Sequence, residues 1–525
     1  MILGEIPSSA QVGFPLLTVL LLLPALGALA VWLIRDRHTA HQVGLWVAMI
    51  ELVLTGVLML LFVPGVPDMQ FVERGPSIPA LGLGYVVGVD GLSVLFLPII
   101  ALLAVLVIGY AEKTATEDVA GYVSAMLAFE STMIGAFISI DLLLFWLVFV
   151  LEMVPSYLLI TRWGTGPLQR EAGRHYVMAM SVGAVLMLAG ILTLAWNHAT
   201  FGDGQRGPSF DLLELLTVPV PLAVQTVAFF ALFFGFAIKA PVFPFHTWLP
   251  KVLEHGPIVG AGVFLVGIKL GTYGFIRFVI PLLPEASREW FWLMAAFGGA
   301  GIVYGALIAL AQTDLRRMLA FGSLSHMGVV MLGLFSLNFA GLQGGLLQMI
   351  NLGITGAGLF FLAGFLHTRI GRPDLKQMGG LLHLVPILTA LFLLITISGI
   401  GLPGTNGFNG EHLVVLGGLE VHWLIAVIAG LGTFLTAAYM LRFFQRAFMG
   451  PVNPSLRPEI PDLRVREVAI AVPLIVLILW IGLYTTPFVR TIEGSLRALE
   501  QRIERGSFAG AQPGDVVTIE AEAHP

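Results

Sequence analysis

The chain has 525 residues, of which 57% are hydrophobic and 11% are charged, and its formal net charge is −5. A soluble domain carries roughly 25% charged residues, so this composition indicates a membrane protein. The absence of cysteine excludes disulfides, thiolate metal sites and cysteine-ligated iron–sulfur clusters within the chain, and the small negative charge offers no basic surface for nucleic acid.

Apolar segments long enough to cross a bilayer recur along the whole chain. The first begins at Phe14 and no basic residue precedes it, so we expect a retained span and not a cleaved signal. Because lipid cannot satisfy an open sheet edge, and these segments are long and unalternating, they predict an all-α polytopic protein with about 14 transmembrane helices. The expected spans are residues 14–34, 41–64, 92–110, 119–139, 141–161, 175–196, 222–252, 257–281, 290–312, 316–336, 342–368, 384–420, 422–447 and 467–488.

Basic residues between these spans predict the orientation of the chain. If the N-terminus lies outside, most loop arginines and lysines face the cytoplasm, as the positive-inside rule requires, and both termini are periplasmic. Four arginines recur in an amphipathic pattern over residues 490–505, followed by a Gly/Pro/Glu-rich end. This tail predicts an interfacial or partner-docking helix rather than a fifteenth span.

Two spans are interrupted by helix-breaking residues. Pro241, Pro244 and Pro250 follow Lys239, and the segment 401–410 precedes Glu411 five spans later. Broken helices in corresponding positions of two halves are typical of structural repeats that build a polar site near the midplane. We therefore expect an N-terminal region at 1–118, repeats at 119–281 and 290–447, and a final helix and periplasmic tail at 448–525.

Ionisable residues inside apolar spans are candidates for function because each costs at least a few kcal/mol there. They include both acids and bases, and such groups, bridged by water, can pass protons. They are Glu51, Glu130, Glu152, Lys239, Lys269 and Glu411, with His175, His246 and His326 nearer the span ends or breaks.

Structural interpretations compete with function at each position. Lys239 could cap carbonyls freed by the prolines, and Lys269 could form a structural pair between helices. Glu411 could be an acid at a helix N-terminus, which the helix dipole favours. His246 and His326, taken alone, are typical of hydrogen bonds between helices.

No His/Asp/Glu group in the sequence has the spacing or density of a metal-ligand set. No glycine-rich loop follows a strand and opens a helix, so the 61 glycines indicate close helix packing and kinks rather than nucleotide binding.

The sequence resembles the antiporter-like membrane subunits of proton-pumping complex I, most closely the chain 4 type, over nearly its full length. The resemblance rests on Gly88–Ser93 at the start of the third span, the broken-helix segment Ala237–Pro250, Ala320–Gly328, and Gly401–Glu411. Together these four motifs are highly specific.

The resemblance implies 14 helices with two inverted five-helix repeats, and roles for three residues. Lys239 would be the central switching lysine, Lys269 the relay lysine of the next helix, and Glu411 the acid towards the periplasmic exit. The implied activity is proton translocation in an NADH- or ferredoxin-dependent quinone reductase of a bacterial inner or thylakoid membrane. Partner subunits of the membrane arm and lipids would surround the chain, which itself would hold no cofactor.

The sequence departs from the family pattern at three polar positions. The usual acid of the fifth span falls at Val150, whereas Glu152 lies two residues later and points about 200° away on a regular helix. We therefore expect Glu152 to face away from Lys239, which would take its counter-charge from Glu130 or have none. The other two departures are Lys251, in place of a usual aspartate, and Leu352, in place of a usual histidine.

Alternative functions remain open at this point. The same fold could belong to a variant complex that uses proton movement for inorganic carbon uptake, which the departures favour modestly. It could also belong to a cation/proton antiporter, which would need a sodium site, or to a structural subunit without conduction.

Overall fold

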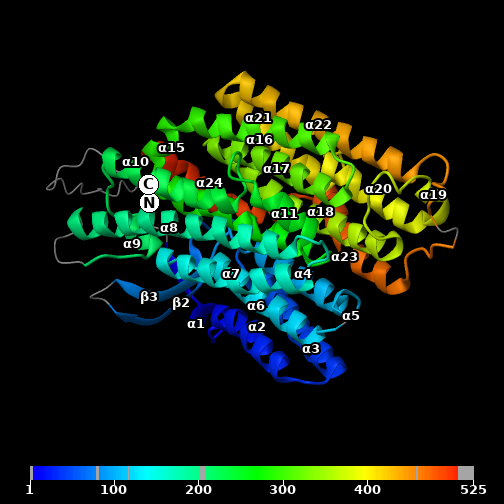
Figure 1. The fold of residues 1–525 in the computed structure, drawn as a ribbon. Coiled ribbons are helices and arrows are strands. Elements are labelled where there is room, and N and C mark those ends of the chain that lie inside the picture. Colours follow the sequence, from blue (N-terminus) through cyan, green and yellow to red (C-terminus); the bar gives the residue numbers. More distant parts are fainter. Residues whose placement is uncertain (1–3, 79–81, 116, 202–206, 457–458, 507–525) are drawn as a thin grey trace.

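The computed structural model describes residues 4–78, 82–115, 117–201, 207–456 and 459–506, and long helices make up most of it (Figure 1). Within these residues, twelve helices are long and apolar enough to cross a membrane, and α4 (Phe96–Gly109) and α20 (Pro386–Ile400) are shorter apolar helices. Each of the fourteen predicted spans overlaps one of these helices. The all-α membrane fold is therefore confirmed.

The N-terminal region adds a small sheet that the sequence interpretation did not include. Its strand order is β1-β2-β3, with β1 parallel to β2 and β2 antiparallel to β3. The elements of this region are β1 (Glu5–Pro7), α1 (Ser8–Gln11), α2 (Leu16–Leu33), α3 (Arg37–Leu61), β2 (Met69–Ile78), β3 (Leu83–Val89), α4 and α5 (Ala111–Thr114).

The first group of central helices contains the proline break. The break separates α10 from α11, and the Trp248 indole Nε1 bridges it by donating to the Ile238 carbonyl at 2.8 Å. The elements are α6 (Val119–Ile138), α7 (Leu142–Trp163), α8 (Gln169–Phe201), α9 (Leu212–Leu215), α10 (Leu222–Lys239), α11 (Trp248–His255), α12 (Ala261–Gly267), α13 (Lys269–Gly274), the π-helix η2 (Phe275–Val279) and α14 (Ile280–Leu282).

The second group contains the break between α20 and α21, at the predicted segment 401–410. Its third long helix, α18, has 32 residues, as α8 in the first group has 33, and a broken helix follows in both groups. This parallel supports the two repeats and their limits, which remain a prediction. The elements are α15 (Pro284–Glu289), α16 (Phe291–Ala311), α17 (Leu315–Phe335), α18 (Phe339–Ile370), α19 (Leu381–Leu384), α20, α21 (Asn406–Val421) and α22 (Trp423–Phe448), followed by α23 (Val465–Leu483) and α24 (Thr486–Arg505).

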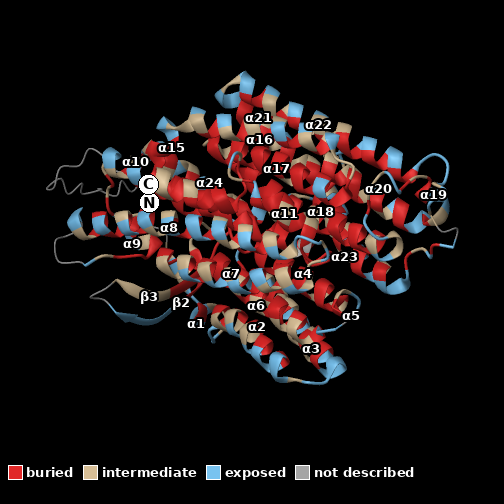
Figure 2. Cartoon of the chain, in the orientation of Figure 1, coloured by how far each residue is buried: buried red, intermediate tan, exposed pale blue. Residues whose placement is uncertain are grey.

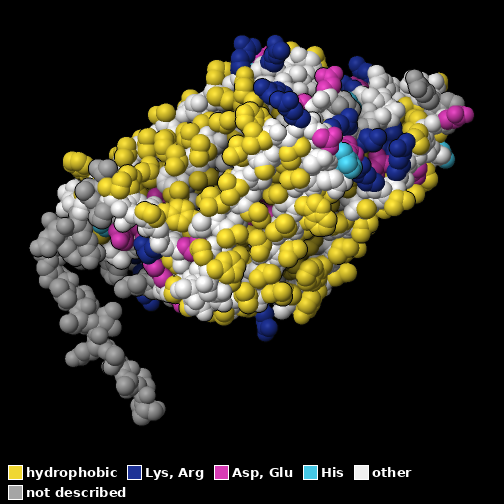
Figure 3. All heavy atoms as spheres, turned by 90° about the horizontal axis from the view of Figure 1, so that it is seen from below, with side chains coloured by type: hydrophobic (Ala, Val, Ile, Leu, Met, Phe, Trp, Pro, Cys, Tyr) yellow, Lys and Arg dark blue, Asp and Glu magenta, His cyan; other side chains and the backbone are white. Residues whose placement is uncertain are grey.

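Burial distinguishes inner from outer helices. α17 and α18 are buried along most of their length, whereas α3 and α22 show exposed residues along one side (Figure 2). Hydrophobic side chains cover most of the face in Figure 3, while Lys and Arg gather towards one end. The exposed side chains also include large apolar ones such as Trp32, Trp196 and Phe434, which suits contact with lipid tails.

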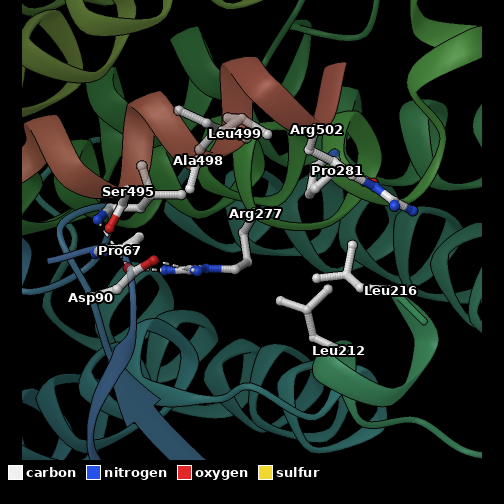
Figure 4. Close-up of a pocket in the computed structure, with 12 residues that line it drawn as sticks. Pro67, Asp90, Leu212, Leu216, Arg277, Pro281, Ser495, Ala498, Leu499 and Arg502 are labelled. Carbon is white, nitrogen blue, oxygen red and sulfur yellow. Dashed lines mark hydrogen bonds and ion pairs between the residues drawn. The ribbon is translucent and has the colours of Figure 1, made fainter. Parts of the chain in front are cut away.

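The amphipathic tail helix α24 is not among the membrane spans, as predicted, but it docks on this chain itself. The Ser495 hydroxyl accepts from the Gly91 amide at 3.0 Å, and the Arg502 guanidinium donates to the Pro281 carbonyl at 3.2 Å. Beside α24 lies a cavity of about 50 Å³, into which the buried Asp90–Arg277 ion pair projects (Figure 4). This chain covers the apolar face of α24, and the interfacial or partner-docking role of the helix stays a prediction.

Candidate functional site

Lys239 forms a buried ion pair with Glu152 at the end of α10. The lysine Nζ donates to Glu152 Oε2 at 2.7 Å, and the two side chains are 2% and 1% exposed. The Tyr176 hydroxyl of α8 donates to the same carboxylate oxygen at 2.7 Å and accepts from Lys239 at 3.1 Å. The Ser156 hydroxyl donates to Glu152 Oε1 at 2.6 Å, so both carboxylate oxygens are occupied.

The prediction that Glu152 faces away from Lys239 is therefore wrong, and so is the expectation that Glu130 takes its place. The buried side of α7 includes Phe145, Phe149, Glu152 and Ser156, which follow the spacing of one helical face. Val150 lies off this stripe and is only partly buried. On α7 it is position 152, and not position 150, that faces α8 and α10, so the direction of Val150 does not indicate where the site lies.

Lys269 continues the site on α13, directly beside the end of α10. Gly271, two residues after Lys269, leaves no room for a Cβ because the Ala240 nitrogen and Phe236 carbonyl lie against it. Lys269 is 2% exposed and its Nζ contacts the Met327 sulfur at 3.3 Å, with no carboxylate in an ion pair with it among the described residues. The span has an irregular turn at Ile268, between α12 and α13, where the backbone stays in the right-handed helical region; the sequence interpretation did not include it.

A cavity of about 30 Å³ joins Lys269 to His326 of α17. Thr355, Tyr439 and Leu352 also line it, so the departure at Leu352 falls on the wall of this cavity. A water molecule needs about 10–15 Å³ measured in this way and at least two polar partners. The cavity has the size and the polar groups to hold water between the lysine and the histidine.

Beyond the cavity, His326 lies next to Glu411 of α21. His326 Nδ1 is 3.6 Å from Glu411 Oε1, and the Gln348 amide donates to the same oxygen at 3.2 Å. The Thr433 hydroxyl donates to Oε2 at 2.7 Å. Glu411 lies beyond the first turn of α21, which contains no acid, so the interpretation as a helix N-terminal acid is wrong.

Side-chain amides and hydroxyls form hydrogen bonds with the second helix break, beside Glu411. The Asn351 amide donates to the Asn406 carbonyl at 2.7 Å, and the Ser398 hydroxyl donates to Asn406 Oδ1 at 2.6 Å. Gly401 has φ +82°, and a Cβ there would meet the Glu411 carboxylate. Glycine at 401 therefore both permits the turn and makes room for the acid.

The remaining predicted residues lie apart from this line. His246 sits in the first break, stacked on Phe243, and its Nδ1 has no hydrogen-bond partner among the described residues. Glu130 and Glu51 are buried on α6 and α3, and their carboxylate oxygens have no hydrogen bond to Lys239 or to any other described residue. His175 lies near the end of α8, where Lys251 Nζ contacts its Nε2 at 3.0 Å and Glu171 Oε1 at 3.0 Å.

Sequence reasoning missed the neutral members of the site. Tyr176 and Ser156 hold Glu152, while Gln348 and Thr433 hold Glu411. Only Ser156 gave a signal, because it lies four residues after Glu152 on the same helical face. The others come from different helices, and single hydroxyls and amides are common in spans.

Comparison with known proteins places the chain in a family. The family model described as NADH:quinone oxidoreductase/Mrp antiporter, transmembrane, matches residues 139–436. NADH-quinone oxidoreductase subunit M of Rickettsia prowazekii (strain Madrid E) is 35% identical over 494 residues, which is 92% of this chain and 98% of that protein. The protein of the same name from Rhodobacter capsulatus is 34% identical and covers 95% of this chain and 99% of its own length.

Solved structures agree with this placement. A chain of respiratory complex I from Thermus thermophilus with bound NADH matches with a TM-score of 0.84 and 30% identity, over 93% of this chain and 99% of that one. A chain of the Mrp complex from Dietzia sp. DQ12-45-1b has a TM-score of 0.81 but 21% identity, over 93% of this chain and 100% of its own, and so shows the fold alone. The predicted resemblance is confirmed: this chain belongs to the NADH:quinone oxidoreductase/Mrp antiporter family of transmembrane proteins.

Proposed function

We propose that this chain is a proton-translocating membrane-arm subunit of a quinone-reducing, complex I-type dehydrogenase in a bacterial inner or thylakoid membrane. The observation that carries the proposal is the buried Lys239–Glu152 pair, held by Tyr176 at the end of a broken helix. Ionisable groups at this depth are costly, and here they are arranged with opposite charge and hydrogen-bonding partners. Its relatives named NADH-quinone oxidoreductase subunit M support the same function.

Lys239 can act as a switch because its charge depends on Glu152. The carboxylate at 2.7 Å stabilises the ammonium form in a site from which water is excluded. If Glu152 moves away or gains a proton, the ammonium loses this stabilisation and its proton is released. The proline break ends α10 at Lys239, so the lysine lies where the regular helical hydrogen bonds stop.

Lys269 and the cavity beside it would receive the released proton. Lys269 lacks an ion-pair partner among the residues that the structure describes, so its amine can exist in the neutral form that accepts a proton. The cavity then leads to His326, and His326 to Glu411. The line Glu152, Lys239, Lys269, His326, Glu411 thus runs from an acid through three basic groups to a second acid, with each residue on a different helix.

We propose that protons enter this line near Lys251 of α11, which contacts the first turns of α8. Glu171, His175 and Lys251 contact one another there and are about 40% exposed. Tyr176, which touches both Glu152 and Lys239, follows His175 directly in the chain. On the predicted orientation this cluster faces the cytoplasm.

Redox chemistry would belong to partner subunits. No group of three His, Cys, Asp or Glu that could hold a metal occurs within the described ranges, and the full sequence has no cysteine for an iron–sulfur cluster. The chain would contribute transport, coupled through other membrane-arm subunits to electron transfer.

Affinity purification of the chain from native membranes tests the function. We expect NADH- or ferredoxin-dependent quinone reductase subunits to co-purify, and the purified complex to acidify vesicles during quinone reduction. Co-purification of a zinc-dependent carbonic anhydrase-like subunit without net pumping would favour the inorganic carbon alternative. Sodium-dependent exchange without quinone reduction would favour an antiporter.

A further inference from the structure

Two acids outside the line described above are buried together on α3 and α6. Glu51 is 0% exposed and Glu130 is 1% exposed. None of their four carboxylate oxygens has a hydrogen-bond partner among the described residues. Buried polar groups are rarely left unpaired, and a buried ion without a partner costs several kcal/mol.

Helix register places the two carboxyl groups opposite each other. Ser124 and Ser131 of α6 donate to the Ala28 and Leu21 carbonyls of α2, so α6 and α2 run antiparallel. α3 follows α2 after a three-residue connection and runs back alongside it, hence parallel to α6. Because the two helices are parallel, if one residue of α3 contacts one residue of α6, the residues seven positions later on each helix also face each other.

The contact between Gly44 of α3 and Val123 of α6 shows which residues of the two helices face each other. A Cβ on Gly44 of α3 would collide with Val123 of α6, so the helices touch here. Seven residues further along both helices, on the same faces, lie Glu51 and Glu130, close enough for their charges to interact.

Among the residues that the structure describes, the elements packed around the pair offer no counter-charge to it. α2 and α4 carry no ionisable side chain, and the Glu152 charge on α7 is already paired with Lys239. The other ionisable groups on the packed elements lie towards helix ends or outside the spans: Arg37, His38, His41, Tyr85, Glu112, Lys113, Tyr122, Tyr157 and Arg162.

We infer that Glu51 and Glu130 form a proton-binding site in which the two carboxyl groups share at least one proton. Two adjacent carboxylates in an apolar environment cannot both remain ionised, and a shared proton supplies the donor that four acceptor oxygens lack. The ligand is thus a proton, held between two helices that the line from Glu152 to Glu411 does not use.

The pair also lies at the depth of Glu152. α6 and α7 form an antiparallel hairpin in which Gly135 packs against Val148. Glu130 lies five residues before Gly135, and Met153 lies five residues after Val148. In an antiparallel pair these two positions are at the same height, so Glu130 lies level with Met153, the neighbour of Glu152 in the chain. Exchange of the proton between Glu130 and Glu152 would rest on the function proposed above, whereas proton binding by the pair does not.

Infrared difference spectroscopy of the purified native complex tests the inference. At neutral pH we expect a carbonyl band of a protonated carboxyl group that shifts in D₂O and is lost in Glu51→Gln or Glu130→Gln. Glu420→Gln, at an exposed position, is the matched control and should leave the band unchanged. This readout does not depend on transport, so the inference can fail while the proposed function stands.

Conservative variants and a change of salt complete the test. Glu51→Asp and Glu130→Asp retain the carboxyl groups, so they should shift the band rather than remove it, even if the glutamine variants fold poorly. A spectrum that none of the four variants changes would overturn the inference. Loss of the band when sodium replaces choline in the buffer would also overturn it, because the pair would then bind a metal cation.

Discussion

Replacing Glu152 by glutamine isolates the charge of the central pair. Glutamine retains the volume of the side chain and can still bond to Ser156 and Tyr176, but it leaves Lys239 without a counter-charge at 2.7 Å. Removing one partner of a buried pair costs about 3–5 kcal/mol. At 1.36 kcal/mol for each factor of ten, this cost corresponds to a factor of roughly 100 to 5,000 in an equilibrium constant.

Proton transport through this chain should therefore fall by about 100-fold or more in Glu152→Gln, as severely as in Lys239→Met. The assay is acidification of membrane vesicles during quinone reduction, with assembly checked by native gel. Glu130→Gln should have a smaller effect because the Glu130 carboxylate has no hydrogen bond to Lys239. Fully assembled Glu152→Gln complex that acidifies vesicles at the wild-type rate would refute the switch role of the pair.

Three further outcomes follow from the same geometry. Glu411→Gln retains hydrogen-bonding groups but loses the charge beside His326, so vesicle acidification should drop at least tenfold while Glu420→Gln has no effect; equal rates would remove Glu411 from the line. Lys269→Met keeps an apolar chain against Met327 and should give an assembled complex with at least tenfold slower transport; normal transport would exclude a relay role. Burial raises the pKa of Asp141, outside the spans, to about 6 from its ordinary 3.8, so the folded state binds this proton more tightly than the unfolded state. Stability is therefore fullest below about pH 4 and falls by about 3 kcal/mol as pH rises through 6; amide exchange in the following turn, corrected for intrinsic rates, should speed up from pH 5 to 7 in the wild type but not in Asp141→Asn.

The sequence was sufficient for the fold and for most charged members of the site. Length and hydropathy located the spans, and Pro241 to Pro250 and Gly401 to Gly410 located two breaks, because these residues act through local backbone chemistry. The irregular turn at Ile268 has no proline beside it, so no local residue signal predicts it.

The pairing within the site depended on three-dimensional information. Glu152 lies on the same buried face of α7 as Phe145 and Phe149. The angle between Glu152 and Val150 on the helix therefore does not predict whether Glu152 faces Lys239. Tyr176 contacts both Glu152 and Lys239 because α8 packs against both α7 and α10. Likewise, the Asp90–Arg277 pair joins residues 187 positions apart, and neither position indicates the other.

The number of protons moved per electron, measured with the purified complex in sealed vesicles, tests the central claim most directly. We predict that Lys239→Met lowers this ratio, while Lys376→Met, at an exposed lysine of the same chain, leaves it at the wild-type value. Quinone reduction is followed in the same vesicles with the proton gradient collapsed, so loss of coupling is separated from loss of electron transfer. An assembled Lys239→Met complex with an unchanged ratio of protons to electrons would contradict proton translocation through this chain.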